Sequence, residues 1–167
     1  MRDFFMLAIL TGVRRGNLQA MRWDELDLER GIWRIPLTKS GEPQSVYLHP
    51  EAVAILERRR EMVGDSEYVF PAAHGKSGHL TSQYKAWKRI CERAGLQNLR
   101  PHDLRRTLGS WQAATGASLP VIGKSLGHRS QEATAVYARL DLDPVRVSVN
   151  RAVEAMLAAG KDGDEEG

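Results

Sequence analysis

The sequence has almost no cysteine and no long apolar run. Cys91 is the only cysteine among 167 residues, so no disulfide can form within the chain and no cysteine cluster can bind zinc. The longest apolar run, residues 4–10, is far shorter than the roughly 18 residues that indicate a membrane span. No signal-peptide cleavage pattern follows it. We therefore expect a cytoplasmic protein that does not associate with membranes.

Charge is unevenly distributed along the chain. The net charge is only +3, but residues 1–160 carry 23 basic and 17 acidic side chains, whereas residues 161–167 carry four acidic side chains and one lysine. With 42% hydrophobic residues, the chain can form one domain that buries roughly 70% of its unfolded surface. We predict a single basic domain over residues 1–160 and a flexible acidic tail over 161–167. A basic domain favours a partner that carries phosphates.

Apolar periodicity and turn residues predict a mainly helical α+β fold with a small antiparallel sheet of about three strands. Strands are predicted at residues 31–37 and 44–48, in the first third of the chain, with Lys39 at the tip of the hairpin between them. Helices are predicted at residues 2–10, 16–26, 50–63, 82–94 and 119–126, from Pro101 onward, around Tyr137 with Ser130 as its cap, and at 144–159.

Two of these helices carry basic residues on their predicted outer sides. We interpret Arg58, Arg59 and Arg60 in the helix at 50–63 as a solvated face. The helix at 82–94 is predicted to turn Tyr84, Trp87, Cys91 and Ala94 inward. Its other side would then present a basic stripe that could follow a nucleic-acid backbone, formed by Lys85, Lys88, Arg89 and Arg93.

His102 and Arg105 lie three residues apart on the helix that begins at Pro101, so they are neighbours on its surface. We expect their face to point away from a core face formed by Leu104, Leu108 and Trp111. Gly109 lies one turn further on the same face as Arg105, where it would leave room for a backbone or a phosphate to approach. A histidine and an arginine at this spacing are by themselves typical of a surface, so their interpretation depends on the rest of the sequence.

Several separate segments together resemble the sequence boxes of one enzyme family. The first segment is 11–14, ending in Arg14, with Trp23 and Asp27 downstream. The others are Thr38-Lys39-Ser40-Gly41, Pro101-His102-Asp103-Leu104-Arg105-Arg106-Thr107, and Leu126-Gly127-His128 followed nine residues later by Tyr137. In this order they resemble the boxes of the tyrosine recombinases, also called phage integrases. The resemblance covers about residues 1–140 and implies the DNA breaking-rejoining enzyme fold.

This resemblance implies that Tyr137 attacks a DNA phosphate and forms a covalent 3′-phosphotyrosine. A tyrosine has a pKa of roughly 10, so ionising it to the phenolate at neutral pH costs about 4 kcal/mol. Cations must offset this cost by stabilising charge on the phosphate oxygens. Arg14 and Arg105 are the residues that the resemblance assigns to that task, each able to hold two oxygens.

The remaining catalytic roles also follow from the resemblance. Lys39 would be the general acid that protonates the leaving 5′ oxygen. His102 would hydrogen-bond the phosphate or accept the tyrosine proton, and His128 would donate a further hydrogen bond to a phosphate oxygen. Because the phosphotyrosine conserves the bond energy, cutting and rejoining would need no ATP, metal ion or other cofactor.

The implied partner is double-stranded DNA, held in part by Lys85, Lys88, Arg89 and Arg106. Exchange of strands between two duplexes implies a homo-tetramer on DNA, with a monomer possible in isolation, and a place at the nucleoid within the cytoplasm. The helix predicted at 144–159 could dock on a neighbouring protomer or pack on its own domain.

Two features depart from the family pattern. The family usually has an acidic residue three positions after the first arginine, where this sequence has Asn17, so we expect the hydrogen bonding that orients Arg14 to be weaker. The sequence also begins just before the first box, so we expect it to lack the family's N-terminal DNA-clamping domain.

Other functions fit the sequence less well. A topoisomerase that uses the same tyrosine chemistry and a DNA-binding fragment that no longer cuts both remain open. The two Gly-Lys-Ser triplets at 75–77 and 123–125 lack the glycine that a phosphate-binding loop needs five residues upstream, where Phe70 and Ser118 stand. The five histidines form no i, i+4 pair and have no cysteine partners that would indicate a metal site.

Overall fold

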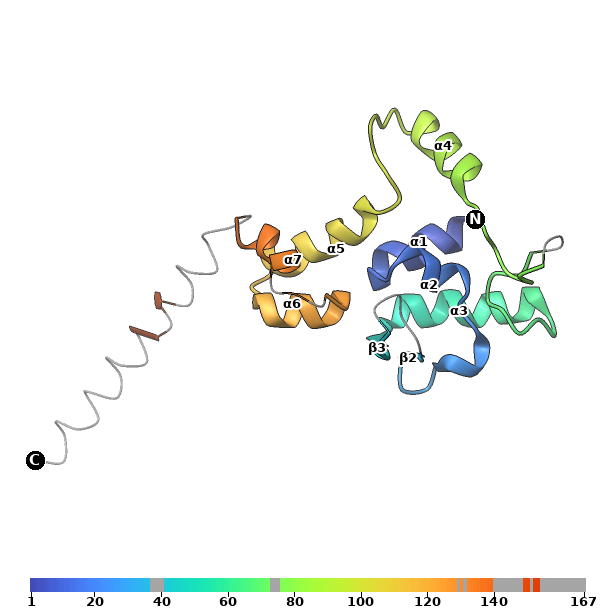
Figure 1. Cartoon of the computed structure of the whole chain (residues 1–167), viewed down its shortest axis with the longest axis horizontal. Helices are drawn as coiled ribbons and strands as arrows, with labels where there is room; N and C mark the ends of the chain where they lie inside the picture. Colours follow the sequence, from blue (N-terminus) through green and yellow to red (C-terminus); the bar gives the residue numbers. More distant parts are fainter. Residues whose placement is uncertain are drawn as a thin grey trace, which may run out of the picture.

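The computed structural model describes residues 1–36, 41–72, 76–128, 130, 132–139, 149, 150, 152 and 153. Within them the fold is the predicted one: mainly helical, with one small antiparallel sheet (Figure 1). The elements are α1 (Arg2–Thr11), α2 (Arg15–Gln19), η1 (Trp23–Glu25), β1 (Leu26–Asp27), β2 (Ile32–Ile35), β3 (Gln44–Tyr47), α3 (Pro50–Val63), α4 (Tyr84–Arg93), α5 (Asp103–Ala114), α6 (Leu119–Leu126), α7 (Glu132–Ala135) and η2 (Val136–Arg139).

The three strands lie in the order β1-β2-β3, and both neighbouring pairs are antiparallel. Ile32 pairs with Tyr47 across β2 and β3. Along β2, Trp33 and Ile35 are buried while Arg34 is exposed, which is the alternation expected of a sheet with one covered face. The turn with Lys39, which the sequence predicts between the last two strands, lies outside the described residues.

The helix predicted at residues 16–26 is wrong beyond its first turn. α2 ends at Gln19, and the chain continues through η1 into β1. The backbone between these elements is bound elsewhere: the Met21 carbonyl accepts from the Val69 amide, and the Trp23 amide donates to the Glu67 carbonyl. These hydrogen bonds to a segment far along the chain replace the intrahelical bonds that local periodicity would favour.

Two apolar clusters form the interior. The larger one joins α1, α3 and the sheet, and its fully buried side chains include Phe4, Leu7, Trp33 and Leu56. The smaller one consists of Ile122, Leu126 and Tyr137, with partly buried residues of α5 and α6 packed against it. α5 contacts both α1 and α6, so it lies between the two clusters.

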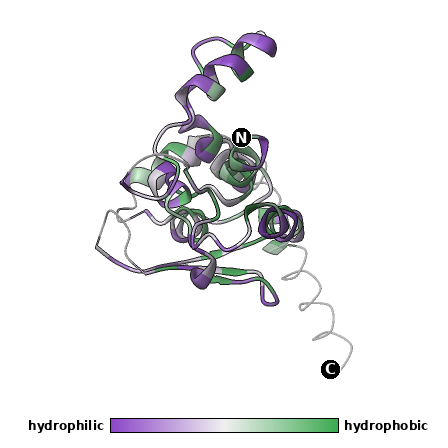
Figure 2. Ribbon diagram, turned by 90° about the vertical axis from the view of Figure 1, so that its right-hand side faces the viewer, coloured by the Kyte–Doolittle hydropathy of each residue, from purple (hydrophilic) through white to green (hydrophobic). Residues whose placement is uncertain are grey.

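α4 projects from the rest of the molecule as the uppermost helix in both views and is mostly hydrophilic (Figures 1 and 2). Of the four residues predicted to face inward, only Trp87 is buried, where its ring packs 5.0 Å from that of Phe5. Tyr84 is 68% exposed, Ala94 is exposed and Cys91 is partly buried. The apolar pattern overestimates burial, because α4 packs on the larger cluster mainly through Trp87, with Ala86 and Cys91 only partly buried beside it.

The arginine run of α3 is also only partly the solvated face that the sequence suggests. Arg58 and Arg60 are exposed, but Arg59 is largely covered. Its Nε donates to the Val69 carbonyl at 2.6 Å, its guanidinium lies over the Phe70 ring, and Asp3 is 3.4 Å away. Arg59 therefore ties α3 to α1 and to the segment after α3.

None of the helices in the described residues is both long enough and apolar enough to cross a membrane. The acidic tail at 161–167 and most of the helix predicted at 144–159 lie outside the described residues.

Candidate active site

The C-terminal turn of α6 is where side chains from three distant segments meet. Gly127 ends the helix in the left-handed conformation, with φ 62° and ψ 46°. The carbonyl groups of a last helical turn have no partner within the helix and carry the negative end of its dipole. Three successive carbonyls here each accept a side-chain donor: Ser125 from Gln44 Nε2, Leu126 from Arg105 Nη2, and Gly127 from Arg14 Nη2.

Arg105 is a buried charge held by the backbone. Its side chain is 4% exposed, and its Nη1 donates to the Gly12 carbonyl at 2.6 Å, at the end of α1. The prediction that this face of α5 points away from the core is wrong for Arg105, because α5 packs on α1 and α6 at once, whereas His102 at the start of the helix is exposed. Burial and the nearby Arg14 lower the pKa of Arg105 to about 10, so the guanidinium is still protonated at neutral pH.

Arg14 lies directly before α2 and donates to the Gly127 carbonyl at 2.8 Å. Its Nη1 is buried and has no hydrogen-bond partner among the described residues, and the same holds for Nδ2 of Asn17. Arg14 and Arg105 are close enough that the charge of Arg14 lowers the pKa of Arg105. The two guanidinium groups repel each other, and Nη1 of Arg14 still has a hydrogen to donate. An anionic oxygen placed between them would therefore be stabilised.

Both histidines of the boxes lie in the electrostatic field of these arginines. Burial, then Arg105 and then Arg14, lower the pKa of His128, which follows Gly127 directly. Burial and Arg105 also lower the pKa of His102, which stands at the N-terminus of α5. His102 itself contributes to the lowered pKa of His128. Residues that lie far apart in the sequence therefore surround one positively charged region.

Tyr137 lies in η2 and is 5% exposed. The cap predicted for the preceding turn is present, since Ser130 Oγ accepts from the Ala133 amide. The phenol ring lies parallel to the His128 imidazole, with 6.4 Å between centroids and 9° between planes. A Cβ added to Gly109 would stand 2.6 Å from Cζ and 2.9 Å from Oη of this tyrosine.

This contact changes the interpretation of Gly109. The sequence suggests that the missing side chain leaves room for a backbone or a phosphate, whereas the structure fills that room with the Tyr137 ring. The phenol is thus seated on α5 one turn from Arg105, and the negative charge of its ionised form acts to raise the pKa of that arginine. The sequence pattern could identify the gap but not its occupant.

Not all of the predicted site residues fall in this region. Lys39 lies outside the described residues. Lys85, Lys88 and Arg89 are exposed on the projecting α4, and Lys88 pairs with Glu92 at 3.7 Å. Arg106 is exposed on α5, next in sequence to Arg105, with its Nη1 3.3 Å from Asp103.

Two residues near the site have no counterpart among the sequence predictions. Gln44, at the start of β3, bonds to the Ser125 carbonyl as described above. Thr134 is 2% exposed, and its Oγ1 lies 2.9 Å from Nδ1 of His128. The position of Thr134, three residues before Tyr137, could have indicated a shared helix face. Nothing in the sequence distinguishes Gln44.

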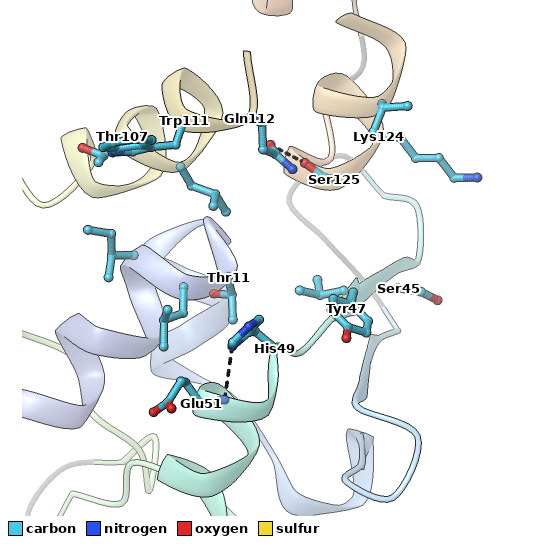
Figure 3. A pocket seen from close by; sticks show the side chains of 15 residues that line it. Thr11, Ser45, Tyr47, His49, Glu51, Thr107, Trp111, Gln112, Lys124 and Ser125 are labelled. Carbon is cyan, nitrogen blue, oxygen red and sulfur yellow. Dashed lines mark hydrogen bonds between the residues drawn. The ribbon is translucent and has the colours of Figure 1, made fainter. Parts of the chain in front are cut away.

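A separate cavity of about 710 Å³ lies between α1, β3, α5 and α6, and its walls are mainly apolar. Figure 3 shows Trp111 on one wall and Tyr47 and His49 on the other. Trp111, predicted to belong to a core face, is 66% exposed at this cavity, because α5 packs on α1 and α6 through its other sides. None of the five described catalytic candidates lines it. Such a cavity suits an apolar group better than a phosphate.

The described ranges of the chain contain no cluster of metal ligands. No three histidine, cysteine, aspartate or glutamate side chains gather there in a way that could hold a metal ion.

Known proteins resemble this chain over most of its length. Tyrosine recombinase XerA of Saccharolobus solfataricus is 28% identical over 95% of this chain and 52% of its own length. Tyrosine recombinase XerC of Xanthomonas campestris pv. campestris is 31% identical over 84% of this chain and 45% of its own length. The chain thus spans about half the length of these curated relatives.

A solved recombinase structure has a similar fold. The crystal structure of the XerH site-specific recombinase bound to difH substrate, a pre-cleavage complex, has a TM-score of 0.70 and 22% identity, over 89% of this chain and 45% of that one. Residues 1–143 match the model of the phage integrase family. Since this match includes α1 through η2 and all of the predicted boxes, the chain belongs to the phage integrase family.

Proposed function

We propose that this chain carries the strand-cutting and strand-joining chemistry of a site-specific DNA recombinase or integrase. Oη of Tyr137 attacks a backbone phosphorus, and the bond between phosphorus and the 5′ oxygen breaks. The 5′ oxygen takes a proton from Lys39, and the 3′ phosphate stays esterified to the tyrosine. A 5′ hydroxyl from another strand then attacks the phosphotyrosine and restores the phenol. The phenol proton passes to His102 or to solvent and is recovered when the phenol is restored, so the cycle needs neither ATP nor a metal ion.

One observation carries this proposal. The guanidinium groups of Arg14 and Arg105 donate to adjacent carbonyls at the end of α6, although 91 residues separate them in the sequence. His128 comes directly after these carbonyls, and the Tyr137 ring lies parallel to its imidazole. Preorganised cations next to a nucleophile are what phosphoryl transfer requires, because charge develops on the phosphate oxygens in the transition state.

The buried phenol also fits the chemistry. The guanidinium of Arg105 keeps its proton at neutral pH, so a cation lies close to the nucleophile. His102 and His128 have lowered pKa values and are therefore mainly neutral at pH 7, when one ring nitrogen can donate and the other can accept. In this proposal His102 accepts the proton of Tyr137 or bonds the phosphate, and His128 donates to a phosphate oxygen.

Double-stranded DNA is the proposed substrate. XerH is a site-specific recombinase whose crystal structure holds its difH substrate, and we extend substrate binding of this kind to the present chain. Exposed Arg106 beside the site, and Lys85, Lys88 and Arg89 on α4, are the proposed phosphate contacts outside the catalytic centre. Because α4 projects from the body, it is free to lie along a duplex whose scissile phosphate is at Arg14 and Arg105.

The test uses a nicked duplex that traps a covalent adduct, incubated with the protein in a metal chelator. We expect an adduct of protein and DNA that denaturing electrophoresis detects, and its loss in Tyr137→Phe. An adduct that persists in Tyr137→Phe, or that forms only with magnesium, would rule the mechanism out. Relaxation of a supercoiled plasmid that lacks any specific site would indicate a topoisomerase instead.

Assembly into a tetramer on DNA is part of the same proposal, because exchange of two strands in each of two duplexes needs four nucleophiles.

We propose that the apolar cavity beside Trp111 receives residues 144–159 of a neighbouring copy. Val149 and Val153, four residues apart in that segment, are both about half exposed. Trp111→Glu should abolish tetramers on DNA in sedimentation while leaving adduct formation on a nicked duplex; unchanged tetramers would exclude this seat.

A further inference from the structure

Thr134 lies buried against His128. Its side chain is 2% exposed in α7, and Oγ1 lies 2.9 Å from Nδ1 of the imidazole. The same oxygen also lies close to Gly123, where an added Cβ would stand 2.9 Å away. The hydroxyl is therefore close both to the imidazole and to the backbone of α6.

The direction of this hydrogen bond depends on where the single hydrogen of the Thr134 hydroxyl can find an acceptor. A threonine hydroxyl has one hydrogen, and a buried hydrogen of this kind needs an acceptor. Thr107 and Thr115 direct theirs to a carbonyl of their own helix. Within the described part of the chain, Nδ1 of His128 is the one partner found for Thr134 Oγ1. If the hydroxyl hydrogen points at Nδ1, then Nδ1 is the unprotonated nitrogen of the ring.

We propose that Thr134 is a positioning residue that holds His128 as the tautomer with its hydrogen on Nε2, and fixes the plane of the ring alongside Tyr137. The effect of this tautomer on catalysis rests on the proposed function, in which His128 donates to a phosphate oxygen. With Nδ1 occupied by Thr134, Nε2 is the nitrogen left to donate. An imidazole with the hydrogen on Nδ1 would offer the phosphate a lone pair and repel it.

The electrostatic surroundings of His128 favour the neutral ring, and this makes control of its tautomer important. Burial and the charges of Arg105, Arg14 and His102 all lower the pKa of His128, which favours the neutral ring. A neutral imidazole exists as two tautomers, whereas the protonated ring donates from both nitrogens. A tautomer-fixing partner therefore matters most where the ring is kept neutral.

Nitrogen NMR on the whole chain tests the tautomer without DNA. In uniformly ¹⁵N-labelled protein near neutral pH, the ring signals of His128 are assigned by their disappearance in His128→Gln. We expect Nε2 to carry the hydrogen and Nδ1 to show the shift of an unprotonated acceptor, in the native chain and in Thr134→Ser. Thr134→Val should move both signals toward the average of the two tautomers. A hydrogen on Nδ1 in the native chain would overturn the proposal, as would an unchanged spectrum in Thr134→Val.

Single-turnover cleavage of the nicked duplex tests the consequence. Thr134→Val keeps the shape of the side chain without its hydroxyl and should slow cleavage about tenfold with unchanged DNA affinity. Thr134→Ser should restore most of the rate. Thr115→Val removes a hydroxyl that bonds its own helix at an exposed position, and its rate should equal that of the native chain.

A double-mutant cycle separates positioning from packing. Glutamine at 128 can donate from Nε2 without a tautomer, so Thr134→Val should cause no further loss in the His128→Gln background. A full tenfold loss in that background would show that Thr134 acts through packing alone. If the native chain forms no adduct, the proposed function fails, and the nitrogen spectrum still decides the tautomer.

Discussion

The two apolar clusters of this molecule are built differently. Among the described residues, the cluster of α1, α3 and the sheet contains sixteen buried apolar side chains, with Trp33, Leu48 and Leu56 almost fully covered. The cluster around α6 has only three, and one of them is Tyr137. Beside the smaller cluster lie the buried guanidinium of Arg105 and the buried hydroxyl of Thr134. The first region is stabilised by apolar burial, whereas the second also depends on hydrogen bonds to buried polar groups.

The larger cluster should therefore determine the stability of the fold, and the smaller one should also determine the proposed chemistry. In the larger cluster a substitution removes apolar contacts and affects the free energy of unfolding. In the smaller one the same groups that hold α5, α6 and η2 together are those proposed to act on DNA. Arg105 is the clearest example, because it connects the end of α1 to the end of α6 and is also a proposed phosphate ligand. Variants in the two regions should therefore differ in kind.

The largest effect is expected for Arg105→Met. Removal of one preorganised cation should lower the rate of adduct formation about 10³-fold. It also leaves the Gly12 and Leu126 carbonyls without their donor, so the free energy of unfolding should fall by about 2–4 kcal/mol. Single-turnover cleavage and urea unfolding measure the two losses. If stability were unchanged, Arg105 would not be the link between the two regions.

Leu56→Ala tests the opposite case in α3. The side chain is fully buried, so its truncation should lower the free energy of unfolding by about 3 kcal/mol through lost contacts and a cavity. Cleavage per folded molecule, measured well below the melting temperature, should match the native chain. A comparable fall in the cleavage rate would mean that the larger cluster is coupled to the site after all.

Gly109→Ala should displace the nucleophile. The new methyl group would meet the Tyr137 ring at 2.6 Å, so the phenol must leave its seat on α5, and we expect cleavage to slow by about tenfold to a hundredfold. Gly16→Ala in α2 is the matched control, since its Cβ would meet nothing within 4 Å. That control should keep the native rate and gain up to about 1 kcal/mol of stability. Equal rates in both variants would contradict the packing of Tyr137 on Gly109.

The smallest effect is expected from pH. Both His102 and His128 have a lowered pKa in the folded chain, mainly through burial. Below about pH 6.5 the unfolded chain binds more protons at these residues than the folded one does. Their contribution to stability is therefore complete above that pH and is lost as the pH falls through the lowered pKa values. Urea unfolding at several pH values should show a shallow decline that the double variant His102→Gln/His128→Gln lacks; a stability that increases toward acid would be inconsistent with these directions.

Local signals predicted the elements wherever neighbouring residues decide the structure. The helix at 50–63 begins at a proline and has the predicted bounds, and Gly12 and Gly127 end α1 and α6 in the left-handed conformation. Prediction failed where a distant segment competes, as at residues 20–27, or where burial depends on which helix packs next, as for Trp111 and Arg105. The order of the boxes was enough to predict the family.

The sequence by itself determined the residue types of the site and the order of the elements, because capping, periodicity and box spacing depend on neighbours along the chain. Only the tertiary structure decided that three carbonyls at the end of α6 receive Gln44, Arg105 and Arg14, that Tyr137 fills the space above Gly109, and that Thr134 binds His128. These contacts join segments whose distance is set by the packing of α5 between two clusters, which no local pattern records.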